Sequence, residues 1–101
     1  MPLSREEELV VYRVAQEALT NIARHADASR VELELHQNRE QTVLTVRDDG
    51  RGLSPGALPS SHGIRGMRER AMLIGAQLTI AAVPAGGTEV KLSVPFEPRT
   101  V

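Results

Sequence analysis

The spacing of apolar residues changes once in this chain, near residue 28, and this change most restricts the possible folds. Before it, apolar residues recur every three or four positions along residues 11–26, which is typical of an amphipathic helix. After it, apolar and polar residues alternate along residues 31–36, as on a strand with one buried face. The sequence therefore predicts a helix packed on a sheet within one short chain.

The predicted first helix begins at a capping box, because Ser4 and Glu7 have the required types and spacing. Its apolar side is expected to face the sheet and comprises Val11, Ala15, Ala18, Leu19, Ile22 and Ala26. Its opposite side is polar and comprises Arg13, Glu17, Thr20, Asn21 and Arg24. A ligand would therefore meet the second set of residues.

The remaining elements are three further strands and a second helix. Strands are predicted at residues 42–48, 77–83 and 88–95, with turns at residues 38–40 and 84–87. A run rich in Gly, Pro and Ser between Gly50 and Gly63 predicts an irregular loop. The second helix has Ile64, Met67, Ala71 and Ile74 on one face and ends near Gly75. The expected fold class is an α+β two-layer sandwich: a mixed, mostly antiparallel sheet with helices on one face, forming one domain over residues 1–101.

The composition excludes several kinds of protein. With 12 basic and 13 acidic residues, the chain lacks the positive charge expected of a nucleic-acid partner. It has no cysteine, so disulfides and thiol catalysis are excluded. No apolar run approaches the ~20 residues of a membrane span, so no direct membrane contact is expected. The three histidines have no metal-binding spacing, and the chain has no Walker-type phosphate loop.

Glu17 and Asn21 could bind a cation. They are four residues apart, so both project from one side of the first helix. A carboxylate and a carboxamide oxygen so placed suit Mg²⁺, whose other ligands would be water and phosphate. The alternative is an ordinary solvated polar face.

Asp48 lies at the end of a predicted strand, before a glycine-rich segment that contains Gly50 and Gly52. Strand alternation turns Asp48 inward, on the side of Leu44 and Val46, and turns Asp49 outward. A buried carboxylate needs hydrogen-bond donors, and the amino group of a ligand could supply one. The alternative is a glycine-rich turn with two exposed acids.

Two further glycine-containing segments could contact a ligand. The segment from Gly63 through Gly66 to Met67 leads into the second helix, where free backbone N–H groups suit a phosphate. Gly86-Gly87-Thr88 precedes the last strand, and alternation turns the Thr88 hydroxyl towards the core layer. The alternatives are a simple loop-to-helix junction and a simple hairpin turn.

The order of these elements resembles that of the GHKL ATPases, the superfamily of gyrase, heat-shock chaperones, histidine kinases and mismatch-repair ATPases. The segment from Glu17 to Asn21, followed by Arg24-His25, resembles the N box of that superfamily. Residues 48–52 match its G1 box, residues 63–67 its G2 box, and residues 86–88 its late glycine-threonine element. The amino-acid sequences of residues 14–21 and 63–70 most resemble those of the nitrate-sensor type of histidine kinase. The response-regulator partners of this type belong to the NarL type.

The resemblance implies a role for each site residue. Asn21 would ligate Mg²⁺, while Asp48 would accept a hydrogen bond from the adenine amino group of ATP. Glu17 is a general base in members that hydrolyse ATP with water; in a kinase we expect it to position Mg²⁺ or its waters. Residues 53–62 would form a short ATP lid. The other residues expected at the nucleotide are Arg24, His25, Gly50, Gly52, Gly63, Gly66, Met67 and Thr88.

The resemblance also implies a function. The chain is expected to be the catalytic and ATP-binding domain of a longer, homodimeric sensor kinase. This domain would lie in the cytoplasm. It would transfer the γ-phosphate to a histidine on a separate dimerisation domain and act indirectly on a response regulator. A preceding helical hairpin and a leading edge strand are expected outside this chain. The alternatives are a serine kinase of the anti-sigma-factor type and a non-catalytic module that senses ATP.

Overall fold

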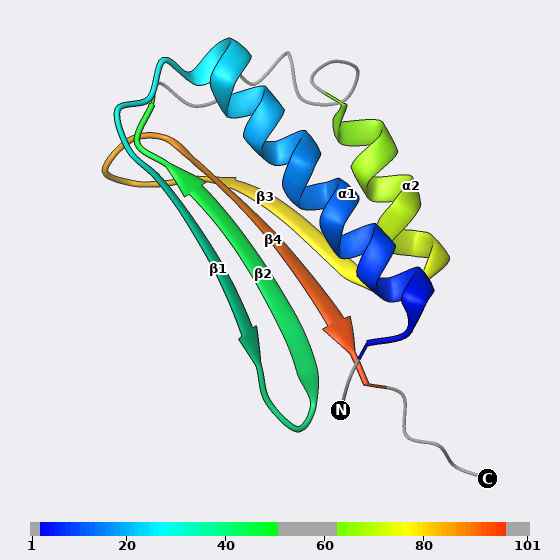
Figure 1. The fold of residues 1–101 in the computed structure, drawn as a ribbon. Helices are drawn as coiled ribbons and strands as arrows, with labels where there is room; N and C mark the ends of the chain where they lie inside the picture. Colours follow the sequence, from blue (N-terminus) through cyan, green and yellow to red (C-terminus); the bar gives the residue numbers. More distant parts are fainter. Residues whose placement is uncertain (1–2, 51–62, 97–101) are drawn as a thin grey trace, which may run out of the picture.

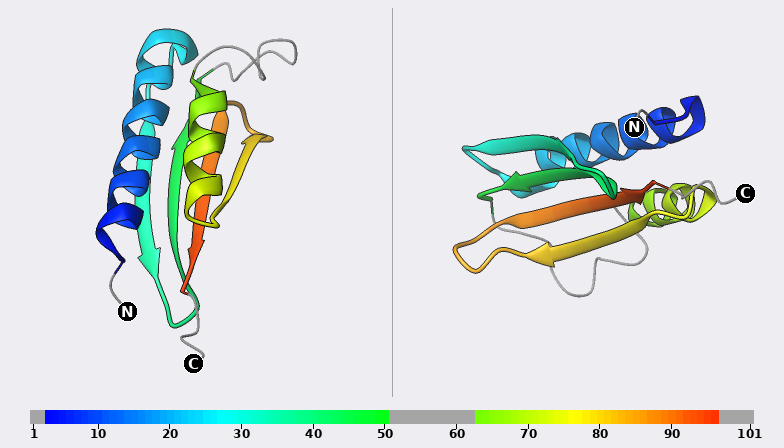
Figure 2. Two further views of the ribbon diagram at one scale, coloured as in Figure 1. Left: turned by 90° about the vertical axis from the view of Figure 1, so that its right-hand side faces the viewer. Right: turned by 90° about the horizontal axis from the view of Figure 1, so that it is seen from below.

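The protein folds into a two-layer sandwich (Figure 1). The computed structural model describes residues 3–50 and 63–96, apart from the side chains of His25 and Ala26. One layer is a four-stranded antiparallel sheet in the order β1-β2-β4-β3. Its strands are β1 (Val31–Gln37), β2 (Gln41–Asp48), β3 (Gln77–Ala82) and β4 (Thr88–Pro95). The other layer consists of α1 (Arg5–Asn21) and α2 (Ile64–Leu73), which lie on the same face of the sheet (Figure 2).

This architecture confirms the predicted α+β class and corrects one detail of it. The expected sheet was mixed, but every observed strand pair is antiparallel. β2 and β3 run in the same direction, yet β4 lies between them and pairs with both. The chain therefore crosses from β2 through α2 to β3 and fills the gap with its last strand. Gly52 and the expected lid, residues 53–62, lie outside the described residues.

Local hydrogen bonds fix the start of α1 and the end of α2 as the sequence predicts. Ser4 and Glu7 form the complete capping box, since each side chain accepts from the other residue's backbone N–H, at 3.0 and 2.9 Å. At the end of α2, Gly75 takes a φ of +67° and Ala76 N donates to Ala71 O at 2.9 Å, which is a Schellman ending. Within the described residues, no helix is both long and apolar enough to cross a membrane.

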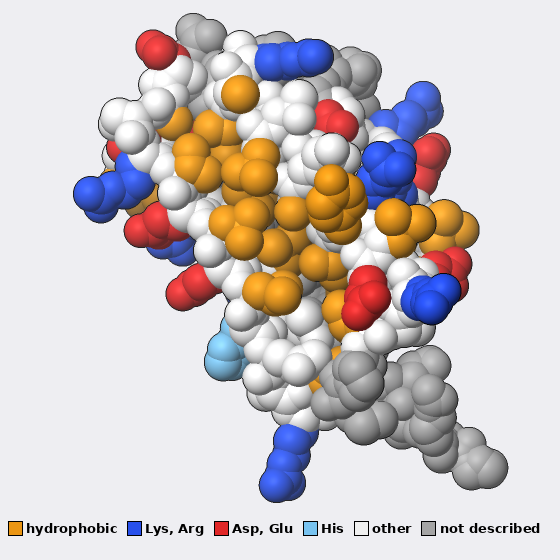
Figure 3. Space-filling model, viewed as in Figure 1, with side chains coloured by type: hydrophobic (Ala, Val, Ile, Leu, Met, Phe, Trp, Pro, Cys, Tyr) orange, Lys and Arg blue, Asp and Glu red, His pale blue; other side chains and the backbone are white. Residues whose placement is uncertain are grey.

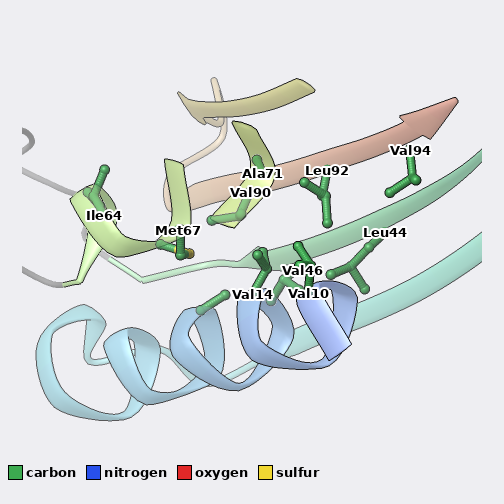
Figure 4. Packing of buried hydrophobic residues seen from close by; sticks show 11 residues of the cluster. Val10, Val14, Leu44, Val46, Ile64, Met67, Ala71, Val90, Leu92 and Val94 are labelled. Carbon is green, nitrogen blue, oxygen red and sulfur yellow. The ribbon is translucent and has the colours of Figure 1, made fainter. Parts of the chain in front are cut away.

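The core lies between the two helices and the central strands (Figure 4). Its members are almost fully buried apolar side chains from α1, α2, β2 and β4: Val10, Val14, Ala18, Leu44, Val46, Ile64, Met67, Ala71, Val90, Leu92 and Val94. The predicted apolar side of the first helix was therefore displaced by about one residue position. Val10 and Val14 form its centre, Val11 and Ala15 flank it, and Leu19 is 40% exposed.

The prediction that β1 has a buried face is wrong. Val31, Leu33 and Leu35 do alternate as expected, and they pair with Asp48, Val46 and Leu44 of β2. They continue the helix-covered face of the sheet, but all three remain 43–58% exposed. The reason is that α1 packs over β2 and β4 and leaves the outer strand uncovered. Figure 3 shows the resulting gathering of apolar side chains between β1 and α1.

This difference between strands can be measured with two matched substitutions. Leu92→Ala in β4 removes a side chain with 0% exposure and should lower the free energy of unfolding by about 2–5 kcal/mol, because a cavity remains. Leu35→Ala removes the same atoms from a side chain that is 58% exposed and should cost less than about 1 kcal/mol. Equal losses in chemical denaturation would contradict the assignment of β1 as an uncovered strand.

Candidate functional site

The residues singled out in the sequence gather at one end of the sandwich. The end of α1, the end of β2, the start of α2 and the turn before β4 all lie at this end (Figure 1). The sheet places the strand ends there, and the helices bring in the polar segments from above. Segments that are far apart in the sequence therefore share one region.

Asp48 is the buried carboxylate of this region. It ends the inward row of β2 after Leu44 and Val46, and it is only 4% exposed, as the alternation predicted. Its Oδ1 accepts a hydrogen bond from Gly50 N at 2.8 Å. No other described residue donates to this carboxylate. Since a buried carboxylate is costly without donors, Asp48 has capacity for a further donor from a ligand.

The turn before β4 packs directly against the backbone of Asp48. Gly87 is buried with a φ of +99°, and a Cβ atom at this position would lie 1.9 Å from Asp48 O. Only glycine therefore fits between β4 and the end of β2. Thr88 follows at 8% exposure, on the same inward face as Val90 and Leu92, which confirms its predicted orientation.

Glu17 of α1 lies against the first residue of the second glycine segment. Gly63 has a φ of +70°, and a Cβ atom there would lie 2.1 Å from Glu17 Oε2. The Glu17 side chain thus occupies the space beside the Gly63 backbone and is half-buried rather than fully solvated. The structure brings together the N-box and G2 residues that the sequence separates by 46 positions.

Asn21 is the last residue of α1 and is half-buried. The helix does not continue regularly to residue 26 as predicted; instead a π-helix, η1 (Ile22–Ala26), follows. This irregular turn contains Arg24, whose side chain is exposed, and the backbone of His25. π-helical turns are rare and occur frequently at functional sites. Among the described residues, no group of three or more His, Asp or Glu side chains could hold a metal.

The start of α2 presents backbone donors that have no partner among residues 3–50 and 63–96. Its N-cap Gly63 provides no side-chain hydrogen bond, and the first turn contains no acidic residue. Met67 N donates to Gly63 O at 3.1 Å, so the helical bonding begins there and leaves the earlier N–H groups, up to that of Gly66, without helical acceptors. The Met67 side chain is 1% exposed and fills the core, so it supports this turn from below.

Asp49 has a structural role that the sequence interpretation missed. It turns away from the core as predicted, but its carboxylate accepts hydrogen bonds from Ser29 N, Ser29 Oγ and Arg30 N at 2.9–3.0 Å. The bonds from the Arg30 backbone, and then from Ser29, hold the pKa of the Asp49 carboxyl below its ordinary value. The partners are 19 and 20 residues away, so sequence spacing gave no signal for this contact.

The tight turn gives a test of the site's construction. Gly87→Ala should lower the free energy of unfolding by several kcal/mol, because its Cβ would overlap Asp48 O and its φ suits only glycine. Gly75→Ala is the matched control: its φ is +67°, but nothing lies within 4 Å of the added atom. The control should cost only about 1 kcal/mol. Thermal or chemical denaturation showing equal losses would contradict the close packing of Gly87 on β2.

Comparison with known proteins agrees with this geometry. Residues 6–98 match the family model described as histidine kinase-, DNA gyrase B-, and HSP90-like ATPase. The chain is 43% identical over 93 residues to the signal transduction histidine-protein kinase/phosphatase UhpB of Salmonella typhimurium, covering 92% of this chain and 18% of that protein. It is 42% identical over 86 residues to the sensor histidine kinase YxjM of Bacillus subtilis, covering 85% of this chain and 21% of YxjM. The chain therefore spans about a fifth of the length of these relatives.

Solved structures show the same fold. The histidine kinase domain of the Erythrobacter litoralis blue-light activated histidine kinase superposes with a TM-score of 0.73 at 30% identity, covering 85% of this chain and 43% of that one. The ATP binding domain of PrrB from Mycobacterium tuberculosis superposes with a TM-score of 0.75 at 21% identity, covering 89% of this chain and 69% of that one. A buried aspartate at the sheet end, the uncapped start of α2 and a match over nearly the whole chain agree: this chain belongs to the histidine kinase-, DNA gyrase B- and HSP90-like ATPase family.

Proposed function

We propose that this domain binds ATP with Mg²⁺ and is the catalytic domain of a two-component sensor histidine kinase. It would donate the γ-phosphate to a histidine on a separate dimerisation domain of the same protein. The observation that carries the proposal is Asp48, a carboxylate that is 4% exposed and receives one hydrogen bond from the described residues. The names of the two relatives given above, a signal transduction histidine-protein kinase/phosphatase and a sensor histidine kinase, support the same activity.

Asp48 suits the adenine end of ATP. The exocyclic amino group of adenine is a donor, and it would supply the second hydrogen bond to this carboxylate. Guanine presents a carbonyl oxygen in the corresponding position, which would leave two acceptors facing each other. Gly50, whose N–H already donates to Asp48, and the buried hydroxyl of Thr88 would border the base. Gly52 is proposed to border it as well, from the sequence match alone.

The start of α2 suits the phosphate end. Its free N–H groups and the positive end of the helix dipole favour an anion, and Gly63 and Gly66 let a phosphate come close to the backbone. Arg24 and His25 belong to η1 at the same end of the molecule and are proposed to face the phosphates. Met67 would hold this turn in place through its buried side chain.

Asn21 suits the metal position. It ends α1, at the same end of the sandwich as the end of β2 and the start of α2 (Figure 1), and a carboxamide oxygen is a hard ligand of the kind that Mg²⁺ binds. Bound Mg²⁺ would neutralise phosphate charge, and phosphoryl transfer depends mainly on such neutralisation and on positioning. Glu17, which lies beside Gly63, would orient the cation or its waters rather than act as a base.

The partners and the branch of the family are parts of the same proposal. The parent protein would be a homodimer whose phosphorylated histidine passes its phosphate to a response regulator. We propose that the chain belongs to the nitrate-sensor type of histidine kinase, because the sequences of residues 14–21 and 63–70 resemble that type. The domain would act in the cytoplasm, where ATP is available, with no nucleic acid or membrane contact of its own.

The base-binding role has a direct test. Asp48→Asn should weaken ATP–Mg²⁺ binding by about 10- to 150-fold, equivalent to the ~1.5–3 kcal/mol of a charge-assisted hydrogen bond. The amide can still accept from Gly50 N, but it cannot satisfy a second donor as a carboxylate does. Isothermal titration calorimetry measures the affinity, and circular dichroism checks the fold. Glu34→Gln, on the exposed strand β1, is the matched control and should bind as wild type. Wild-type affinity in a folded Asp48→Asn domain would refute the role.

The metal role has a separate test. Asn21→Ala should reduce the gain in ATP affinity that Mg²⁺ provides by about tenfold, the equivalent of ~1.4 kcal/mol, and should leave adenosine binding unchanged, because adenosine carries no phosphate to hold the metal. Thr20→Ala, at the neighbouring and likewise half-buried position, is the control and should preserve the gain. Equal losses for adenosine and ATP–Mg²⁺ would show that Asn21 shapes the pocket instead.

A further inference from the structure

Asp49 joins two parts of the molecule that carry different ends of the proposed site. Its Oδ1 accepts from Ser29 N and Arg30 N, both at 2.9 Å, and its Oδ2 accepts from Ser29 Oγ at 3.0 Å. Its own backbone N donates to Arg30 O at 3.2 Å. We call these four hydrogen bonds the Asp49 latch. They tie the segment before β1 to the residue that directly follows Asp48.

The latched segment leads directly back to Asn21. From Asn21 the chain passes through the π-helix η1 and through Asp27, whose φ is +51°, before it reaches Ser29. Apolar packing anchors the start of this path, where the half-buried Ile22 contacts the core, whereas Ala23 beyond it is exposed. A π-helical turn is also less regular than an α-helix. The latch fixes the far end of this path, at Ser29 and Arg30, to the residue that follows β2.

The other side of the latch is rigid. Asp48 belongs to β2, which pairs with β1 on one side and β4 on the other. Gly87 packs on the Asp48 carbonyl with no room for a side chain. A restraint attached at Asp49 is thus attached to the firmest backbone near the site.

We propose that Asp49 is a positioning residue that holds the Asn21 end of α1 at a fixed distance from Asp48. The metal-binding and base-binding residues would then already be aligned before the nucleotide binds. Binding would therefore not require free energy to order the end of α1. This inference rests on the proposed function, because it assigns to Asp49 the alignment of the two halves of that site. It gives the second acid of the Asp48-Asp49 pair a role distinct from that of the first.

The latch itself is tested by amide hydrogen exchange without nucleotide. Asp49→Ala removes both acceptor oxygens, so the amides of Ser29 and Arg30 should exchange at least about tenfold faster. Asp49→Asn should retain most of the protection, because one carboxamide oxygen can replace Oδ1 and still accept from both N–H groups. Glu40→Ala, at the opposite end of the β1–β2 hairpin, is the matched loss of an acid and should leave both rates unchanged.

The positioning role is tested by calorimetry with adenosine, ATP and ATP–Mg²⁺. Asp49→Ala should reduce the Mg²⁺-dependent gain in ATP affinity by about tenfold and leave adenosine affinity within about twofold, with Asp49→Asn restoring most of the gain. In an Asn21→Ala background, Asp49→Ala should reduce the Mg²⁺-dependent gain little further, since both residues would act on the same contact between Asn21 and the cation. A role in global stability alone would lower the melting temperature and leave these ratios unchanged.

The outcomes separate the two proposals. Unchanged exchange of Ser29 and Arg30 in Asp49→Ala would overturn the latch while leaving ATP binding intact. Equal losses for adenosine and ATP–Mg²⁺, or additive losses in the double variant, would overturn the coupling to Asn21. A wild-type chain that binds neither ligand would overturn the proposed function and the positioning role with it. If Asp49→Ala does not fold, Asp49→Asn alone tests the proposal. This variant should keep most of the Mg²⁺-dependent gain in ATP affinity. A folded Asp49→Asn domain with wild-type stability that has lost the gain would overturn the proposal.

Discussion

The packing of α1 on the inward side chains of β2 and β4 determines where everything else lies. Val10, Val14 and Ala18 are at most 6% exposed, and they meet the buried rows that contain Val46 and Leu92. Once this stripe is buried, the rotation of α1 about its axis is fixed. Glu17 then lies beside Gly63 at the start of α2. The core thus sets the direction in which the polar residues face.

The end of β2 separates two consecutive acids by the simplest property of a strand. Alternation buries Asp48 among the core rows and turns Asp49 to the outside. Among the described residues, the Asp48 carboxylate receives one hydrogen bond and can accept another, whereas the Asp49 carboxylate accepts from Ser29 N, Ser29 Oγ and Arg30 N. Asp48 and Asp49 therefore have different roles although both are aspartates, because their side chains lie on opposite faces of the sheet.

Sequence reasoning predicted the elements well and their environments less well. Strand alternation placed Asp48 and Thr88 inward correctly, because a period of two leaves only two faces. The same reasoning failed at Leu33 and Leu35, because alternation shows that a strand has an apolar face and not whether a helix covers it. The predicted apolar side of α1 was displaced because four neighbouring positions are apolar: Val10, Val11, Val14 and Ala15. Helical periodicity alone does not show which of them lie at the centre of the buried side. The Asp49 latch could not be predicted, since it needs the three-dimensional approach of two distant segments.

The uncovered strand β1 has a consequence for how copies of this chain meet. Within residues 3–50 and 63–96 no strand pairs with the outer edge of β1, and this edge and the row of Val31, Leu33 and Leu35 would invite a second β1 to pair with it. In an antiparallel pairing centred on Leu33, Glu32 of one copy would face Glu34 of the other on the helix-free side. Like charges directly opposite each other repel, so each such pair would oppose the contact that the apolar row favours. The two glutamates of β1 would thereby disfavour this pairing of identical sheet edges.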